Sequence, residues 1–548
     1  SRGRFRPLLT AAPRTAALVA VTGLAAATVV AGQAWRPDPT PAPPAQALPL
    51  TATSAVPVCP GPQPLQAPDG AKAVAAPGPT VVGAVVAPPG LLGPDGAVGA
   101  GRAARARLSP MLRGQEGPAT EGGTAVTAAA DRAGVLRATV ADGADVPAPG
   151  AGPLRLDSVR DGALPALGAT QVTLARSGDL RGLSAVSCGV ASTDAWLLGG
   201  GTQVGRRARL LLANPAPAPA VVDVSALGPD GAVDAPSGEG VVVPAGGQVA
   251  VLVDALAPGL AALAVHVVAR SGRVTATLHD EVVRGLAPGG TDGVTASAGP
   301  STRQVVPGLS VNAGNGSDDA TAAGAAAVRV AVPGTTDAVV RVRLLGPDGP
   351  VDLPRAVRTV VAGTVVDLPV TGVPTGLYTA VVEADVPVVA AGLVGRTVRP
   401  PTTGGADGVP DVLPGDGRVA DLAWSASAAG ARGLTAVAAP AVDGVKVVLS
   451  LGAVEPARVT VVPLSADGVP GTPKTLDLAG GTTGSFTLPP GSSGALMRTL
   501  TGTVHAGLTF GAGDPRGPLV AAAAVRPASA GTTGRPPVVV ADPAPGMP

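Results

Sequence analysis

The chain has 548 residues, more than one hydrophobic core supports, which predicts about three or four domains. Its 39 basic and 38 acidic residues leave a net charge of +1, so it lacks the positive field with which proteins neutralise the phosphates of nucleic acid. Hydrophobic residues make up 46% of the chain, too many for a disordered protein, and an aromatic content of 1% argues against a cleft that stacks sugars.

The N-terminus predicts a membrane anchor. Residues 1–14 carry four arginines and no acid, and Thr15–Ala34 then runs 20 residues without a charge. A helix of that length spans a hydrocarbon layer of roughly 30 Å, and the leading arginines place residues 1–14 in the cytoplasm. We expect a transmembrane anchor over residues 15–35 and a single-pass cell-membrane protein with an extracytoplasmic body. The alternative is a cleaved signal peptide ending at "AGQA", which makes the protein secreted.

A Pro-rich stretch over residues 36–76 predicts a semi-rigid stalk that also contains the first strand. Cys59 and Cys188 are the only cysteines of the chain. An even number of cysteines in an exported protein favours a disulfide between them. Two free buried thiols, or a metal pair that lacks further ligands, are the alternatives.

Residues 77–195 predict a looser β-domain. Strand-like runs such as "PTVVGAVV" and "GATQVTLAR" flank a Gly/Ala/Arg-rich segment, which we interpret as a long exposed loop. Its arginines indicate a solvated loop or, less favoured, contact with anionic lipid or wall polymer. They are Arg102, Arg105, Arg107 and Arg113.

Three copies of one module follow. The motif "LGPDG" at Leu227–Gly231 recurs at Leu345–Gly349 and, as "LSADG", at Leu464–Gly468, so that the last glycines lie 118 and 119 residues apart. Two further Gly-containing markers follow each motif in the same order. A fourth "LGPDG", at Leu92–Gly96, lacks these markers, and we do not count it as a module. The modules are placed at residues 196–300, 301–410 and 411–548, the last with a Pro-rich tail.

Each module predicts antiparallel strands, because short Val-rich runs alternate with Gly/Pro punctuation. In the first module, a two-residue turn at Ser271–Gly272 predicts a hairpin in which Leu263, Val265 and Val267 share an apolar face with Val274, Ala276 and Leu278. The expected fold class is all-β, with an N-terminal transmembrane helix followed by tandem antiparallel Ig-like β-sandwich modules.

The repeated Pro-Asp-Gly is typical of a turn, since Pro presets φ, Asp caps the bend and Gly accepts a positive φ. Asp230, Asp348 and Asp467 are alternatively metal or ligand contacts. Each stands alone among hydrophobic neighbours, so we interpret the motif as a bend.

Histidines offer the main candidate for a metal site. His266 and His279, with Asp280 or Glu281, form a potential zinc set on the predicted hairpin. Asp280 is expected on the opposite face, so surface histidines without a metal are favoured. His505 is the third and last histidine.

Three other features are candidates for chemistry. "GGGTQVG" at Gly199–Gly205 resembles a phosphate loop, but a strand-like run follows it in place of a helix. "NAGNGSDDAT" offers Asn315, Asp318 and Asp319 to calcium without the alternating spacing of calcium loops, so a flexible linker is favoured. Trp196 and Trp424, each placed before a module's opening strand, are expected to be core residues. No common hydrolase signature occurs.

The segments "VPVCPGP", "SCGVASTDAWLLGGG", "RARLLLANP" and "VPVVAAGLVGR" together resemble an uncharacterised family of secreted or membrane-anchored proteins of high-G+C Gram-positive bacteria. The resemblance covers most of the chain after Cys59, and a Pro expected shortly after Cys188 is missing. It implies an extracytoplasmic, β-rich protein, supports Cys59 and Cys188 as partners, and supplies no activity or catalytic residue.

The sequence therefore predicts a non-enzymatic envelope protein with a structural or interaction role, without catalytic residues, cofactor or metal. Its expected partners are envelope proteins of unknown identity and, through the N-terminal helix, the membrane. The alternative is an accessory module that binds cell-wall polysaccharide and works with an envelope enzyme.

Overall fold

The computed structural model of the chain describes residues 48–49, 56–62, 78–113, 124–140, 153–159, 165–285, 287–320, 322–398, 419–526 and 538–539. The chain forms two compact units, one over Ser54–Gly531 and the other over Ser1–Thr53 with Thr532–Pro548. In the smaller unit, β1 (Leu48–Pro49) pairs antiparallel with β35 (Val538–Val539). The predicted anchor at 15–35 lies outside the described residues, and none of the helices that are described is long and apolar enough to cross a bilayer.

The larger unit consists of four β-sandwich modules, and the prediction of an all-β fold is confirmed. The N-terminal module pairs a sheet of order β10-β9-β3-β7 with one of order β11-β2-β8-β4-β6. Its strands are β2 (Pro57–Cys59), β3 (Thr80–Ala87), β4 (Ala104–Pro110), β6 (Thr124–Ala128), β7 (Gly134–Val140), β8 (Leu154–Val159), β9 (Ala166–Ala175), β10 (Gly182–Ser187) and β11 (Gly189–Val190).

The first repeat has sheets of order β20-β19-β13-β17-β5 and β12-β18-β14-β15, with β16 also paired to β14. The strand β5 comes from the preceding module and runs parallel to β17. The elements are β5 (Leu112–Arg113), β12 (Asp194–Leu198), β13 (Arg206–Ala213), β14 (Ala220–Gly228), β15 (Gly231–Val233), η1 (Pro236–Gly238), β16 (Val241–Val243), β17 (Gly247–Leu252), α2 (Val253–Leu256), β18 (Ala264–Ser271), β19 (Thr275–Arg284) and β20 (Ala287–Thr295).

In the second and third repeats, one long strand bends and belongs to both sheets of its sandwich. The second repeat contains β21 (Ser301–Val311), β22 (Ala326–Ala331), β23 (Ala338–Gly346), β24 (Gly349–Val360), β25 (Val365–Pro369), the long β26 (Gly376–Val398) and β27 (Val419–Ala426). The third contains β28 (Ala431–Ala438), β29 (Val445–Ala453), β30 (Ala457–Leu464), β31 (Lys474–Leu478), β32 (Thr482–Thr487), the long β33 (Gly494–Ala512) and β34 (Leu519–Ala524).

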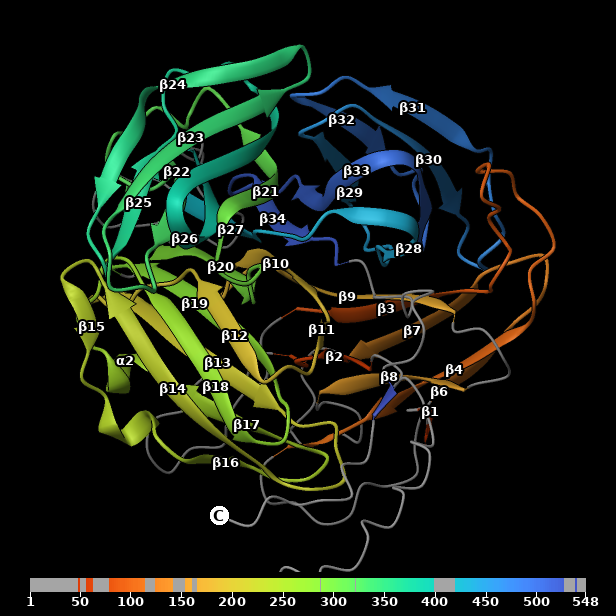
Figure 1. Ribbon diagram of the computed structural model, residues 1–548, viewed down its shortest axis with the longest axis horizontal. Coiled ribbons are helices and arrows are strands. Elements are labelled where there is room, and N and C mark those ends of the chain that lie inside the picture. Colours follow the sequence, from red (N-terminus) through yellow and green to blue (C-terminus); the bar gives the residue numbers. More distant parts are fainter. Residues whose placement is uncertain are drawn as a thin grey trace, which may run out of the picture. The chain divides into compact units, whose positions relative to one another are not determined.

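One strand of each module lies at the centre of the unit. The four innermost strands are β10, β20, β27 and β34, and each is an outermost member of its own sheet. The strand β10 packs against β20 and β34, and β27 packs against the same two strands, which closes a ring (Figure 1). The modules therefore form a four-bladed, propeller-like arrangement, whereas the sequence predicted a tandem row.

Alternating apolar residues explain why each module closes into a sandwich. Along β23, Ala338, Val340, Val342 and Leu344 are buried, while the intervening side chains are exposed or half-buried. Such a strand buries one face against the opposing sheet and solvates the other. Strands near the ring, such as β27, are buried along their whole length because neighbouring modules cover their second face.

The predicted hairpin at Ser271–Gly272 is wrong. The strand β18 pairs with β12 and β14 in one sheet, and β19 pairs with β13 and β20 in the other. Leu263, Val265, Val274 and Leu278 are all buried in one core, because the two strands face each other across the sandwich. Alternation on a shared apolar face is the same for a hairpin and for a crossover between sheets, so the pattern did not distinguish them.

The interpretation of the Pro-Asp-Gly motif as a bend is confirmed. Gly228 pairs with Gly231 across a two-residue turn, and Gly346 pairs with Gly349 in the same way. The glycines Gly231 and Gly349 have φ angles of 130° and 138°, which a residue with a Cβ rarely adopts. The related motif at Leu464–Gly468 also turns, with the Gly468 amide donating to the Ser465 carbonyl.

The N-terminal module has the same inner strand order as the repeats, although its "LGPDG" lies between β3 and β4 and not at the equivalent turn. The segment interpreted as an exposed loop contains β4, where Ala104, Ala106 and Leu108 are buried between exposed Arg105 and Arg107. The strand β27, whose residues fall in the range assigned to the third module, pairs with β26 of the second repeat.

Candidate functional site

Two aspartates hold the central ring together. Asp292 lies on β20 and Asp421 on β27, and their side chains are 0% and 1% exposed. Neighbouring innermost strands do not form a continuous ladder with each other, so some of their backbone amides need side-chain acceptors. The two carboxylates provide those acceptors.

Both oxygens of Asp292 are occupied. Oδ1 accepts hydrogen bonds from the Ala185 amide at 3.0 Å and the Gly293 amide at 2.8 Å, and Oδ2 accepts from the Trp424 amide at 2.7 Å. Asp292 therefore ties β20 to both β10 and β27.

Asp421 uses its two oxygens unequally. Oδ2 accepts from the Leu183 amide at 3.2 Å and from the Val520 amide at 2.8 Å, which joins β27 to β10 and β34. Oδ1 is buried and accepts no hydrogen bond of normal geometry, although the neighbouring Leu422 amide also favours the ionised carboxylate. A Cβ added at Gly182 or Gly290 would lie 2.9 or 2.8 Å from this oxygen, so the two glycines leave the space that it occupies.

Burial controls the protonation of both groups. It raises the pKa of Asp421 to about 7, against the opposing effect of backbone hydrogen bonds from Val520, Leu183 and Leu422 and of the Arg181 charge. Burial also raises the pKa of Asp292 well above its usual value, although three amides donate to it. Nearby Asp421 adds to the rise by repulsion.

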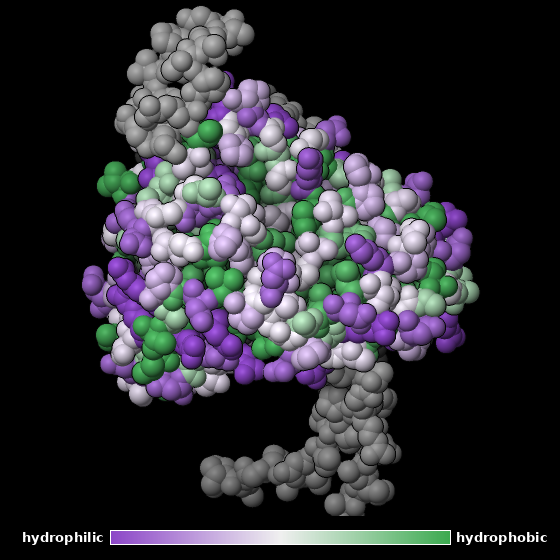
Figure 2. Space-filling model, turned by 90° about the horizontal axis from the view of Figure 1, so that it is seen from above, coloured by the Kyte–Doolittle hydropathy of each residue, from purple (hydrophilic) through white to green (hydrophobic). Residues whose placement is uncertain are grey.

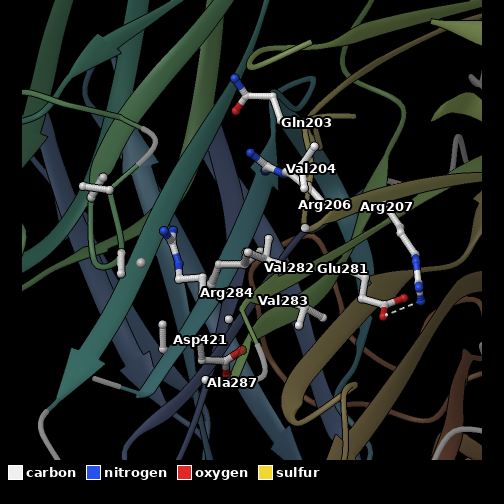
Figure 3. Close-up of a pocket in the computed structure, with 18 of the residues that line it drawn as sticks. Gln203, Val204, Arg206, Arg207, Glu281, Val282, Val283, Arg284, Ala287 and Asp421 are labelled. Carbon is white, nitrogen blue, oxygen red and sulfur yellow. Dashed lines mark hydrogen bonds and ion pairs between the residues drawn. The ribbon is translucent and has the colours of Figure 1, made fainter. Parts of the chain in front are cut away.

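A cavity of 1070 Å³ adjoins Asp421. It lies where β20 and β27 begin, and the loop Thr202–Gly205, the end of β19 and the segment before β22 complete its walls. Figure 3 shows Gln203 and Val204 on one side of the cavity and Asp421 with Ala287 on the opposite side. Its volume is just above the usual range of small-molecule sites, which is about 300–1,000 Å³, and three modules supply its walls.

Two of the cavity's arginines are held by carboxylates. Arg206 donates to both oxygens of buried Asp280, at 2.8 and 2.6 Å. Arg207 is paired with Glu281 at 3.4 Å, as the dashed line in Figure 3 marks. Burial raises the pKa of Glu281, with the arginines opposing that shift. These pairs fix the wall that β13 and β19 form.

A buried network behind this wall joins the first and second repeats. The Trp424 indole donates to Asp280 Oδ2 at 2.8 Å, and the Arg329 guanidinium lies 4.8 Å from the centre of the Trp424 ring. Arg329 also donates to the Gly200 carbonyl at 2.6 Å and pairs with Asp367 at 2.7 Å. Because Trp424 also donates its amide to Asp292, this network reaches the central ring.

The potential zinc set is not assembled. His266 and His279 lie in opposite sheets, and no group of three possible metal ligands occurs among the described residues. His266 stacks on Trp196 with ring centres 3.9 Å apart, and His279 is 3% exposed, so the expectation of a surface position fails for His279. His279 is buried because its strand, β19, lies next to the innermost strand β20. Asp280 and Glu281 are instead engaged by Arg206 and Arg207, respectively.

The other candidates have structural roles. Buried Asn315 accepts from the Asn312 amide and from Arg396, so it organises its loop. Asp318 accepts a hydrogen bond from the Thr371 hydroxyl. The Ser317 hydroxyl donates a hydrogen bond to the backbone carbonyl of Asp319. The loop Gly199–Gly205 is followed by β13, as the sequence indicated, and its second half lines the cavity. Trp196 and Trp424 are buried, as expected.

The predicted disulfide between Cys59 and Cys188 is present, with Cα atoms 4.4 Å apart. It connects β2 to the segment directly after β10, so it joins the outer sheet of the N-terminal module to the ring. His505, the remaining histidine, faces the Ala428 carbonyl at 2.8 Å, and burial lowers its pKa.

Sequence reasoning missed Asp292 and Asp421. Each stands in a short run of small and apolar residues, "TDGVT" and "ADLAW", where a strand is otherwise buried. A single carboxylate within a buried strand was the available signal, because such a group requires partners.

The comparisons with known proteins address the family and not the activity. No curated protein matches the chain. The solved structures that match the chain include a tetra-tandem repeat from the extending region of a large adhesion protein and the BSP domain of a biofilm-associated protein. The first is 14% identical, covers 78% of this chain and 92% of its own, and has a TM-score of 0.09. The second is 7% identical, covers 86% and 96%, and has a TM-score of 0.10.

Those TM-scores are too low to indicate a common fold. A family model matches residues 135–489, which span parts of all four modules. Since that match covers more than half of the sequence, the chain belongs to DUF5719, a family of unknown function.

Proposed function

We propose that this protein is a non-enzymatic interaction protein of the cell envelope of a high-G+C Gram-positive bacterium. In this proposal, residues 15–35 anchor it in the membrane, residues 36–76 form a stalk, and the Ig-like sandwich modules stand outside the cytoplasm. The disulfide Cys59–Cys188 supports an oxidising compartment, because disulfides persist mainly in exported proteins.

The observation that carries the proposal is the cavity beside Asp421. Its charged walls are already engaged in fixing the fold, through Arg206 with Asp280 and Arg207 with Glu281. Groups held in this way present a preformed surface that suits binding. The four-module ring supplies a rigid support on which such a surface keeps its shape.

The outer surface is consistent with a protein that meets partners in water. Figure 2 shows hydrophilic and hydrophobic residues interspersed over the face that it presents. Val204, at the rim of the cavity, is fully exposed. Because Val204 is exposed, it can be replaced to test the cavity entrance without disturbing the core.

In-cell crosslinking of the tagged full-length protein, followed by mass spectrometry, tests the proposal. We expect a small, reproducible set of envelope proteins, and crosslinks that decrease when Val204 is replaced by Glu at the cavity rim. The matched control is Val357→Glu, an exposed valine on β24 away from the cavity. Crosslinks only within the protein itself, with co-purified wall glycan, would instead support the polysaccharide-binding module.

A further inference from the structure

We propose that a second cavity, where the four innermost strands end, binds a carboxylate carried on a short aliphatic group, with the Arg526 guanidinium as its partner. The inference goes beyond the proposed function, because this cavity lies at the other end of β27 from the cavity beside Asp421. The carboxylate belongs either to a free organic acid or to the C-terminus of a peptide, and the experiment below separates these sources.

The innermost strands of all four modules end around one cavity, which we call the strand-end cavity. It is lined by Ser187 from the end of β10, Ser297 after β20, Ser427 after β27 and Arg526 after β34. Its volume of 280 Å³ lies just below the range of about 300–1,000 Å³ that is usual for small-molecule sites, so it suits a small group. A site to which every module contributes exists only in the closed ring.

The first argument is the charge of Arg526, which has no counter-charge. Arg526 is the only charged residue among the described residues that line the strand-end cavity. Within the part of the chain that the structure describes, no hydrogen bond or ion pair engages its guanidinium. Burial lowers the pKa of Arg526 to about 10, which reflects the cost of holding its charge away from water. An anion that enters the cavity offsets that cost.

The second argument is that a ligand can reach the guanidinium. Nε of Arg526 is buried without an acceptor, but Nη1 and Nη2 are not among the buried polar atoms, and the residue as a whole is half-buried. A group that loses hydration while solvent still touches its terminal nitrogens lies in a recess, and the strand-end cavity is the recess that Arg526 lines. Val190, another residue of its wall, is 42% exposed and marks its opening.

The third argument concerns the kind of anion. The planar guanidinium matches the two oxygens of a carboxylate, with which arginine forms paired hydrogen bonds. A phosphate monoester carries a charge of about −1.5 to −2, so part of its charge would stay unmatched beside a single arginine. Ala436, Val437 and Leu508 also line the cavity, and their apolar side chains accommodate a short aliphatic group.

The wall of the strand-end cavity is held in place by hydrogen bonds between modules. The Ser187 hydroxyl donates to the Ala524 carbonyl at 2.7 Å, which joins the ends of β10 and β34. The Ser297 hydroxyl donates to the Ala390 carbonyl of β26 at 3.0 Å. The cavity is therefore preformed, and little ordering is needed when a ligand binds.

Isothermal titration calorimetry of the full-length protein with sodium butyrate tests the proposal. We expect saturable binding of butyrate, no binding of butyramide, which has the same shape without charge, and weaker binding of butylphosphonate. N-acetyl-alanyl-alanine, titrated in parallel, separates the sources: tighter binding than butyrate indicates the C-terminus of a peptide, and weaker binding indicates a free organic acid.

Two variants locate the site. Arg526→Gln keeps a polar side chain and removes the charge, so we expect the affinity for butyrate to fall at least about tenfold. Arg498→Gln is the matched control, because Arg498 is also a half-buried arginine of the third repeat and does not line the strand-end cavity. Its affinity for butyrate should equal that of the wild type.

Should Arg526→Gln fail to fold, Ala298→Phe at the half-buried wall of the strand-end cavity replaces it as the test. Ala298 bonds to Ser427 through its backbone amide, which the substitution keeps, so butyrate binding should be lost while the melting temperature is retained.

Four results overturn the inference: no binding of butyrate, equal binding of butyramide, tighter binding of butylphosphonate than of butyrate, or wild-type affinity in Arg526→Gln. Val204→Glu alters the other cavity and should leave butyrate binding unchanged. Envelope crosslinks that respond to Val204→Glu in a protein that does not bind butyrate would leave the proposed function standing, whereas butyrate binding without envelope partners would contradict that function alone.

Discussion

Asp292 and Asp421 are the same residue type on equivalent innermost strands, yet their surroundings differ. Asp292 accepts three amides through both oxygens and lies outside the cavity lining. Asp421 gives one oxygen to two amides and keeps the other without a partner beside the cavity. A buried carboxylate that is completely hydrogen-bonded stabilises the fold, whereas a buried oxygen left without a donor costs stability in the folded protein.

Removing the acceptor at the fully bonded aspartate should have the largest effect. Asp292→Ala leaves the amides of Ala185, Gly293 and Trp424 without their acceptor, and at about 1–3 kcal/mol for each unsatisfied buried group we expect a loss of about 3–9 kcal/mol in the free energy of unfolding. Urea unfolding followed by tryptophan fluorescence measures it. A loss below about 1 kcal/mol, on the scale of an ordinary surface substitution, would contradict the role of Asp292 in the ring.

The pH dependence of stability probes Asp421 directly. Its pKa is raised from 3.8 to about 7 in the folded protein, so the folded state retains a proton that the unfolded chain has released. Its contribution is complete below pH 3.8 and is lost as the pH rises to about 7. At 1.36 kcal/mol per pH unit we expect the wild type to lose roughly 2–3 kcal/mol between pH 5 and pH 8.

Asp421→Asn is the control for that measurement, because it removes this titration. Asp292 acts in the same direction, since its pKa is also raised. His505 acts in the opposite direction, because its lowered pKa favours the folded state as the pH rises. The difference between wild type and Asp421→Asn isolates Asp421, and identical pH profiles for the two proteins would rule out its raised pKa.

Replacing each aspartate by asparagine sharpens the comparison. At position 292, an asparagine amide nitrogen must face a backbone amide, because both oxygens accept hydrogen bonds, and we expect a loss of about 2 kcal/mol. At position 421, the nitrogen takes the site of the partnerless oxygen, and we expect a loss below about 1 kcal/mol at pH 5, where the native carboxyl is mostly protonated. Thermal unfolding of both variants at pH 5 measures the two losses of stability. A larger loss for Asp421→Asn than for Asp292→Asn would contradict the hydrogen-bond partners assigned to the two aspartates.

We expect the smallest effect on stability from replacing an aspartate outside the ring. Asp230 is exposed in the turn between β14 and β15, and its replacement by Ala should change the free energy of unfolding by less than about 0.5 kcal/mol. The same urea titration measures it. A larger effect would show that the turn motif contributes more than a bend.

The repeats show what sequence patterns predicted well. The Pro-Asp-Gly turns, the Val-rich strands and the disulfide were all predicted, because each depends on local conformational preference or on a simple count. The hairpin at Ser271–Gly272 and the exposed loop around Arg105 were predicted wrongly. At the hairpin the alternation of residues was correct, but the partner strands were not encoded near it in the chain. In the loop segment, the alternation of buried alanines and leucine with exposed arginines that marks β4 was not recognised.

Local residue patterns in the chain specify the strand-rich modules, their bends and the covalent link between Cys59 and Cys188. The closure of four modules into a ring and the position of Asp421 beside a cavity depend on contacts between the modules. The hydrogen bonds that do this join residues 132 positions apart for Trp424 and Asp292, and 238 positions apart for Leu183 and Asp421. A local pattern shows that a strand is buried and contains a carboxylate, but the donors that satisfy that carboxylate come from other modules and are fixed only when the modules pack together.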